Sequence, residues 1–69
     1  LSVNYTLPIT VIIPQGGTAY NPAIYVNGFA ASVIGTGPSA TVSRTNAYYY
    51  TIICTGINQY AYFGFAVAL

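Results

Sequence analysis

Only a few side chains of this 69-residue chain could take part in chemistry. The chain contains no Asp, Glu, His or Lys, and its single charged side chain is Arg44. General acid–base catalysis near neutral pH needs a His, a carboxylate or a Lys with a shifted pKa. Oxygen and imidazole ligands for Ca²⁺, Mg²⁺ or catalytic Zn²⁺ are also missing, unless several chains pool their Cys54 thiols. We therefore expect no enzyme, no cofactor and no metal site.

The remaining candidate groups favour structural roles. Cys54 lies in the apolar run TIICT, which favours a small buried side chain over a disulfide between chains or a reactive thiol. Arg44 is expected to be solvated or bonded to carbonyl groups, with the C-terminal carboxylate of Leu69 as the alternative partner. The motif Asn4-Tyr5-Thr6 fits the N-glycosylation pattern, so Asn4 is the expected attachment point of a glycan.

The composition predicts self-association. A domain of this size buries only roughly 60% of the surface that its unfolded chain exposes. Such domains usually depend on disulfides, metal ions or association, and here only association is left. The charged fraction is 1%, so little repulsion keeps free chains apart. One Arg cannot hold a phosphate backbone, so nucleic acid is not an expected partner. We expect identical subunits as the partners and no small-molecule substrate.

The N-terminal segment alternates almost without error. Its apolar side chains share one face over residues 2–13, which predicts a strand about twice the usual length. Because Pro8 cannot donate to a ladder, it marks an edge or a break. The segment is either the first strand of its own sheet or, over residues 1–13, a donor strand that completes a neighbouring subunit. In the second case the assembly interface contains Val3, Tyr5, Leu7, Ile9, Val11 and Ile13.

The rest of the chain also reads as short strands between turns. Residues 23–26 and 29–34 flank Asn27-Gly28, which is the favoured pair of a type I′ hairpin. Further strands are expected at 40–44, 47–55 and 60–69, with a short helix as the alternative for the last. The sequence thus predicts one all-β domain over residues 1–69, a small antiparallel β-sandwich or partly open barrel that a neighbour's strand could complete.

Three consecutive tyrosines, Tyr48, Tyr49 and Tyr50, must point to both faces of their strand. Their ordinary role is packing between strands within the sheet. Tyrosine is also enriched at subunit interfaces, because it combines apolar area with a hydroxyl that tolerates water. We therefore assign Tyr48, Tyr49 and Tyr50 to the predicted assembly interface.

The composition resembles a class of assembling proteins. The combination of almost no charge with many Thr, Tyr, Asn and β-branched residues is similar to the outer domains of pilus-like extracellular filament subunits, and to certain virion proteins, of archaea from hot acidic habitats. This resemblance implies a secreted structural protein that forms a homopolymer at a cell or virion surface. A first residue that is Leu instead of Met fits a processed, secreted product. Residues 1–13 cannot form the long assembly helix of type IV pilins, so strand exchange is the expected mode of assembly.

Two functions of other classes remain open from the sequence. Several chains could contribute alternating strands to a membrane-associated β-pore, with tyrosines at the level of the headgroups. The chain could also be a surface module that binds carbohydrate through exposed tyrosines.

The missing acidic and basic side chains predict stability in acid. Stability changes with pH only where the folded and unfolded states bind different numbers of protons, and carboxylates and histidines usually supply that difference. We expect the melting temperature of the assembled protein to stay within a few degrees between about pH 2 and about pH 7. Thermal melts at several pH values measure this. A steep loss of stability in acid would show that a charged partner or a glycan controls the assembly.

Overall fold

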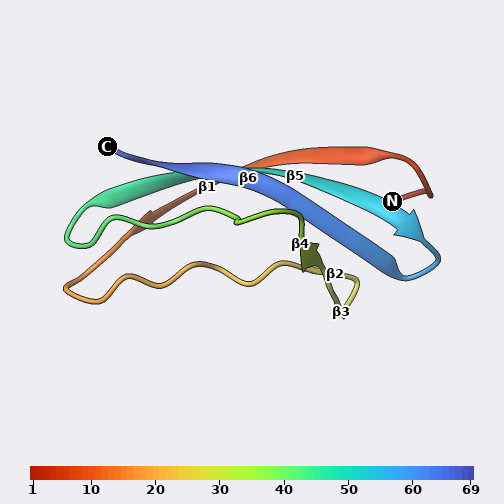
Figure 1. The fold of residues 1–69 in the computed structure, drawn as a ribbon, viewed down its shortest axis with the longest axis horizontal. Coiled ribbons are helices and arrows are strands. Elements are labelled where there is room, and N and C mark those ends of the chain that lie inside the picture. Colours follow the sequence, from red (N-terminus) through yellow and green to blue (C-terminus); the bar gives the residue numbers. More distant parts are fainter.

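Three long strands form the main sheet of the protein, whose computed structural model describes all residues from 1 to 69. They are β1 (Thr6–Pro14), β5 (Thr45–Gly56) and β6 (Gln59–Ala68). β5 lies in the middle and pairs antiparallel with both others. A two-residue strand, β4 (Ser32–Val33), pairs in parallel with the start of β6, so the order is β1-β5-β6-β4 (Figure 1). The sheet is open, and the all-β fold that the sequence predicts is confirmed.

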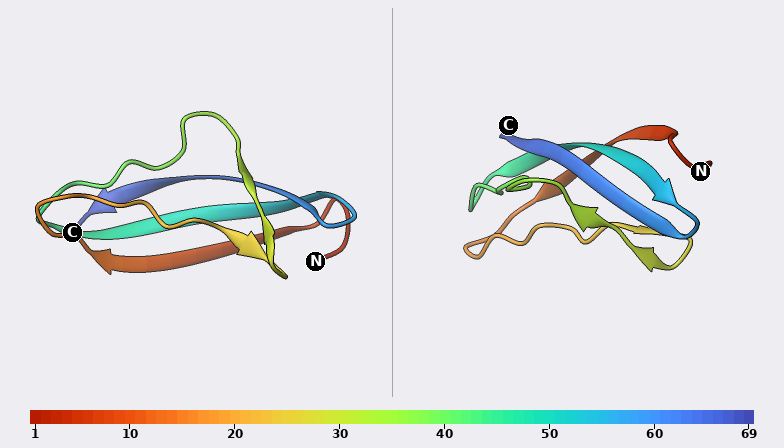
Figure 2. Two further views of the ribbon diagram at one scale, coloured as in Figure 1. Left: turned by 90° about the horizontal axis from the view of Figure 1, so that it is seen from below. Right: turned by 45° about the vertical axis from the view of Figure 1, so that its right-hand side comes forward.

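The segment between β1 and β5 covers one face of this sheet. It runs along the sheet as a mostly irregular layer, below the sheet in Figure 1; in the left view of Figure 2 its orange and yellow part passes in front of the sheet and its green part arches past β6. Its regular parts are β4, which pairs with β6, and a hairpin of β2 (Tyr25–Val26) and β3 (Phe29–Ala30). Asn27 and Gly28 between them have φ values of 52° and 85°, as a type I′ turn requires, so this predicted hairpin is confirmed.

The core lies between the layer and the sheet. Because side chains alternate along a strand, the even-numbered residues of β5 and β6 and the odd-numbered residues of β1 face the layer. Ile24 of the layer packs against Tyr48, Tyr50 and Ile52 of β5. Only 8 of the 69 residues are buried, so this core is small even for a chain of this length.

Two amide side chains attach the layer to the sheet. Asn46 is fully buried; its Oδ1 accepts a hydrogen bond from the Thr41 amide (3.0 Å), and its Nδ2 donates to the carbonyls of Thr41 and Arg44 (2.9 Å each). Gln15 at the end of β1 accepts from the Tyr20 amide (3.0 Å) and donates to the Tyr20 carbonyl (2.7 Å). The amide groups of both side chains thus supply the hydrogen bonds that the backbone of a neighbouring strand would otherwise supply to the layer.

The predicted strand at residues 40–44 is wrong. Thr41–Arg44 instead form a turn, in which Ser43 has a φ of 56° and its amide donates to the Gly16 carbonyl (2.8 Å). The polar groups of Thr41 that a sheet ladder would use are bonded to Asn46. The local preference of this Thr- and Val-containing run for strand is therefore overridden by a side chain of the next element.

Other predicted boundaries also change. β1 begins at Thr6 instead of Ser2, because Asn4 has a φ of 68° and the Tyr5 amide donates back to the Ser2 carbonyl (3.0 Å). The expected strand at residues 29–34 is divided into β3 and β4. Residues 60–69 form strand β6 up to Ala68, so the helix alternative for this run is wrong.

Tyr48 and Tyr50 lie at the centre of the core, but only the Tyr48 hydroxyl is hydrogen-bonded. Their rings stack with centroids 6.0 Å apart. The Tyr48 hydroxyl accepts a hydrogen bond from Gln15 Nε2 (2.8 Å) and donates to the Tyr20 carbonyl (3.3 Å). The Tyr50 hydroxyl is buried without a partner. Burial, and then the neighbouring Tyr48 and Tyr62, raise the pKa of Tyr50 from 10.0 to about 12.

The raised pKa of Tyr50 makes stability depend on alkaline pH. A pKa that is higher in the folded state contributes stability that is fully present below the unfolded value of 10.0 and is lost as the pH rises through about 12. The reason is that the unfolded chain gives up this proton more readily than the folded chain does.

The two buried hydroxyls predict opposite effects for the same substitution. Tyr50→Phe removes a buried polar group without a partner, so we expect a free energy of unfolding that is unchanged or higher by up to about 1 kcal/mol. Tyr48→Phe removes the hydroxyl that accepts a hydrogen bond from Gln15 Nε2, so it should lower the free energy of unfolding by about 1–3 kcal/mol. Chemical denaturation at neutral pH measures both. Equal losses in the two variants would contradict the assigned hydrogen bonds. Tyr50→Phe should also remove part of the loss of stability above pH 10.

Candidate assembly surface

The face of the sheet that points away from the layer is uncovered. It consists of the even-numbered side chains of β1 and the odd-numbered side chains of β5 and β6. Six of its large apolar members are 40% to 61% exposed, and we call these six side chains the outer apolar face: Ile12, Tyr49, Phe63, Phe65, Val67 and Leu69. Leu69 continues β6, because its amide donates to the Thr45 carbonyl (2.8 Å).

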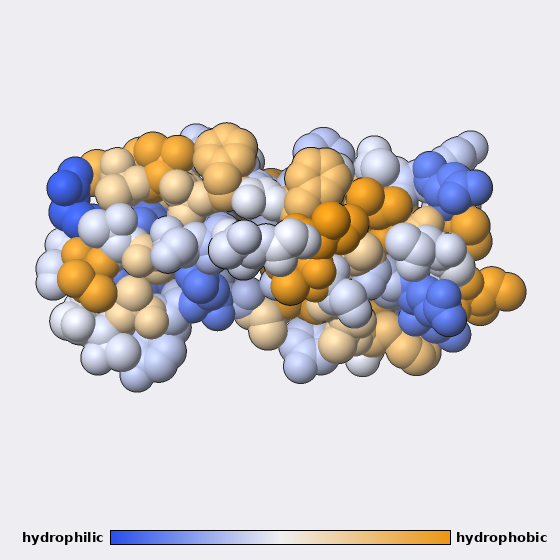
Figure 3. All heavy atoms as spheres, viewed as in Figure 1, coloured by the Kyte–Doolittle hydropathy of each residue, from blue (hydrophilic) through white to orange (hydrophobic).

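An aromatic pair lies in the middle of the outer apolar face. Tyr49 and Phe65 are directly opposite each other on β5 and β6, and their rings stack with centroids 5.1 Å apart at an angle of 28°. Cross-strand pairs of this kind hold side chains in fixed positions. Seen from the side in Figure 3, apolar side chains gather along the upper surface over β6, while the most hydrophilic ones lie apart from one another. The surface is thus ordered before any partner binds.

The predicted interface residues in and before β1 differ in their exposure to solvent. Val3, Tyr5 and Leu7 are exposed, whereas Ile9, Val11 and Ile13 are half-buried against the core of their own chain. The structure thus pairs this strand with β5 of the same chain. Its exchange into a neighbouring subunit stays a prediction, in which the same three side chains would fill the same site of the neighbour.

The backbone of β1 explains where its prolines are tolerated. The Gln15 amide donates to the Arg44 carbonyl (3.0 Å) and the Cys54 amide to the Tyr5 carbonyl (3.1 Å), so the odd-numbered residues of β1 direct their backbone polar groups toward β5. The even-numbered residues, among them Pro8 and Pro14, direct theirs to the free edge. The missing N–H of each proline therefore costs the sheet no hydrogen bond, and the expected edge position of Pro8 is confirmed.

The three consecutive tyrosines do not share a role. Tyr48 and Tyr50 are 0% and 2% exposed and belong to the core, so their assignment to the assembly interface is corrected. The reason is the strand period, which turns both toward the layer. Tyr49 alone points outward and belongs to the outer apolar face. Asn4 is exposed in the turn before β1, where a glycan would meet no packed side chain.

Sequence reasoning missed the β6 side of this surface. The strand predicted at residues 60–69 was not assigned to an interface, although it contains the exposed side chains of Phe63, Phe65, Val67 and Leu69. The signal was present, because bulky residues alternate there with Gly64, Ala66 and Ala68. Gly64 also has a second role, since a Cβ at this position would overlap the carbonyl oxygen of Tyr49.

The two side chains that could take part in chemistry, Cys54 and Arg44, make structural contacts within the chain. Cys54 is buried and free, as expected, and its thiol lies 3.2 Å from the Gly56 carbonyl oxygen. Arg44 donates from Nε (3.1 Å) and a terminal nitrogen (2.7 Å) to the backbone oxygen of Leu69, the residue named above as its alternative partner. No helix of the structure has the length and apolar character needed to cross a membrane.

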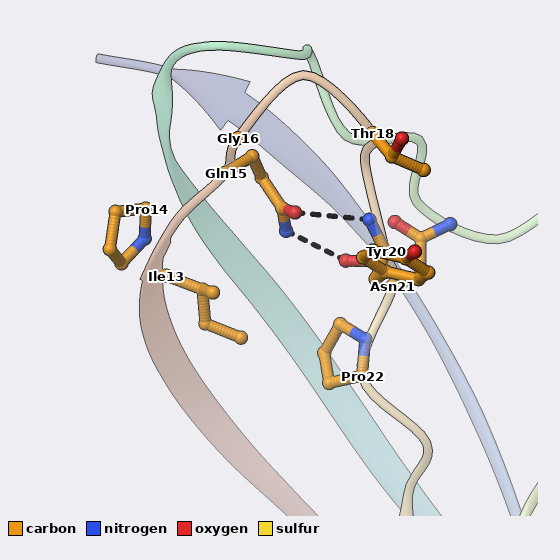
Figure 4. Close-up of a pocket in the computed structure, with 8 residues that line it drawn as sticks. All are labelled: Ile13, Pro14, Gln15, Gly16, Thr18, Tyr20, Asn21 and Pro22. Atoms are coloured by element: carbon orange, nitrogen blue, oxygen red, sulfur yellow. Dashed lines mark hydrogen bonds between the residues drawn. The ribbon is translucent and has the colours of Figure 1, made fainter.

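One open pocket lies between the end of β1 and the layer. It has a volume of 530 Å³ and is lined by Ile13, Pro14, Gln15, Gly16, Thr18, Tyr20, Asn21 and Pro22. Figure 4 shows the Gln15 side chain reaching across it to the backbone of Tyr20. The polar groups of Gln15 are thus already satisfied by the protein. The pocket contains no ionisable group that could act on a ligand, apart from the Tyr20 hydroxyl.

Comparison of the chain with protein-family models, with characterised proteins and with solved structures finds no match.

The packing of β1 predicts that this strand can be supplied in trans. A chain that lacks residues 1–14 loses three side chains that pack on the core and exposes one edge of β5, so we expect it to lose its fixed tyrosine packing. An excess of a peptide of residues 1–14 should restore the near-ultraviolet circular dichroism of the tyrosines. A peptide with Ile9→Asn and Val11→Asn is the control and should not restore it. A shortened chain that folds alone, or that the unchanged peptide does not rescue, would exclude β1 as an exchangeable strand.

Proposed function

We propose that this protein is the structural subunit of a homopolymer, such as a pilus-like extracellular filament or a virion component. Assembly with identical chains is then its biochemical function. The subunits join through their apolar sheet faces and by addition of strands, and no catalysis is involved. The observation that carries the proposal is the uncovered outer apolar face, on a sheet whose other face is already covered by the chain's own layer.

The extent of exposed apolar surface supports association. Seventeen large apolar side chains are exposed, whereas only eight residues of any kind are buried. Monomeric soluble proteins rarely leave large contiguous apolar patches in water. Six of these side chains lie together on the outer apolar face. Covering them would add a second core about as large as the first.

The lack of charge supports a second copy of this chain as the occupant. A partner for an uncharged apolar face must itself present an uncharged apolar face, because an unpaired charge buried there would be costly. The same chain offers such a face. Two sheets pack face to face at about 10 Å when side chains from both inner faces interdigitate. Two outer apolar faces in contact would produce a sandwich in which each sheet comes from a different subunit.

Surface display is consistent with the same properties. With one Arg as the only charged side chain, neither salt nor acid has much to act on. Such a polymer would keep its subunit contacts in an acidic or saline exterior. An exposed Asn4 outside the sheet leaves room for glycans that would hydrate the finished surface.

Replacing one aromatic side chain on the outer apolar face tests the proposal. Phe65→Ser removes a side chain that is 59% exposed and stacks on Tyr49, so it should hardly affect the fold but raise the concentration needed for assembly by about tenfold or more. Ile57→Ser is the matched control, because Ile57 is 86% exposed but lies in the turn between β5 and β6, away from this face. Light scattering against concentration, with electron microscopy of the product, measures assembly.

The comparison of these two variants has a clear negative outcome. If Phe65→Ser and Ile57→Ser change assembly equally, general surface hydrophobicity drives it and the outer apolar face is not the specific contact. If both variants and the unaltered chain remain monomeric at high concentration, the proposed function is wrong.

A further inference from the structure

The two edges of the sheet differ in their capacity to accept another strand. On β1, the free edge presents N–H groups only from Thr6, Thr10 and Ile12, because Pro8 and Pro14 interrupt the row. Prolines at these positions are a known protection against strand addition. β6 contains no proline, and its free edge begins where β4 ends.

Backbone hydrogen bonds show which groups of β6 are free. The Leu69 amide donates to the Thr45 carbonyl (2.8 Å), and the Ile34 amide donates to the Tyr62 carbonyl (2.7 Å). Odd-numbered residues of β6 therefore bond to β5, and even-numbered residues face the other side. β4 covers that side only at Ala61 and Tyr62. No hydrogen bond within the chain is made by the outward backbone groups of Gly64, Ala66 and Ala68.

We infer that the β6 edge pairs with the β6 edge of a second copy of this chain, antiparallel and centred on Ala66. In this register Ala66 faces Ala66 of the second copy, and Gly64 faces Ala68 in both directions. All three outward N–H groups and all three outward carbonyls of each chain then find partners. Residues 63–69 take part, and β4 blocks a longer overlap. The inference rests on the proposed self-assembly and specifies its geometry.

The side chains of β6 fit this two-fold arrangement. On the outer face, Phe65 lies opposite Val67 of the second copy, which gives two aromatic and β-branched pairs of the kind that stabilises neighbouring strands. On the layer side the β6 side chains at the junction are those of Gly64, Ala66 and Ala68, none of which is bulky. The result is a continuous sheet in which the two outer apolar faces join side by side into one larger face.

This pairing also determines how a polymer would grow. Contact between two β6 edges is isologous, so it closes after two subunits and cannot extend by itself. A second isologous contact, in which the two outer faces of one pair each meet a subunit of a different pair, would connect these pairs into an open chain. The protein would thus assemble from edge-paired dimers instead of adding single subunits.

A proline scan of the two edges tests the inference. Ala66→Pro removes an outward N–H without breaking the bonds between β5 and β6, and it should raise the dissociation constant of the dimer by about tenfold or more. Thr10→Pro is the matched control, because it removes an outward N–H from the free edge of β1 and should leave association unchanged. Sedimentation velocity measures the dimer, and circular dichroism checks the fold of each variant.

Hydrogen exchange on the unaltered assembled protein gives a second measurement that needs no substitution. The Ala66 and Ala68 amides should exchange slowly in the assembly and the Thr10 and Ile12 amides rapidly. Association that is unaffected by Ala66→Pro, or equal exchange at both edges, would overturn the β6 pairing while leaving self-assembly intact. An unaltered chain that never associates would overturn both.

Discussion

The structure depends on one constraint: a chain of this length can cover only one face of its own sheet. β5 is a central strand with neighbours on both sides, and residues 15–44, apart from the edge strand β4, form the layer on one of the two sheet faces. That layer has little secondary structure, so it is attached by the amide side chains of Asn46 and Gln15. None of residues 1–69 covers the other face. The outer apolar face and the free β6 edge both follow from this shortage.

The near absence of charge acts together with that constraint. In most small domains, charged side chains cover the surface that the fold leaves open and keep molecules apart. Here Arg44 is held at Leu69, and the open face carries aromatic and aliphatic side chains. The polar groups of the core are amides and hydroxyls that bond within the chain, with the Tyr50 hydroxyl as the exception. We predict that the stability of such a fold is insensitive to acid, and we propose that association completes its burial of apolar area.

The sequence was sufficient for the parts of the fold that depend on local patterns. Alternation identified β1, β5 and β6, and Asn27-Gly28 identified the hairpin, because these signals act over a few residues. The sequence failed to predict the structure of residues 40–44, because it depends on a single side chain, Asn46, which lies between the strands predicted at 40–44 and 47–55. It also began β1 too early, because alternation continues through residues whose backbone turns at Asn4.

The candidate surface was harder to predict because it requires the register between strands. Alternation shows that Tyr48 and Tyr50 share a face and Tyr49 has the other, but only the position of the layer shows which face is buried. The pairing of Tyr49 with Phe65 likewise joins residues from two strands. The direction of each backbone N–H, which distinguishes the β1 edge from the β6 edge, follows from individual hydrogen bonds. Sequence alone could therefore predict association but not the surface that carries it.

Sedimentation equilibrium of the unaltered chain over a wide range of concentrations tests the central claim most directly. The account predicts a mass that rises above the 7.3 kDa of one chain as the concentration increases, in the absence of detergent or any other partner. A mass that remains at one chain up to the highest concentration reached, with the fold intact, would show that the open sheet face is stable in water and would contradict the account.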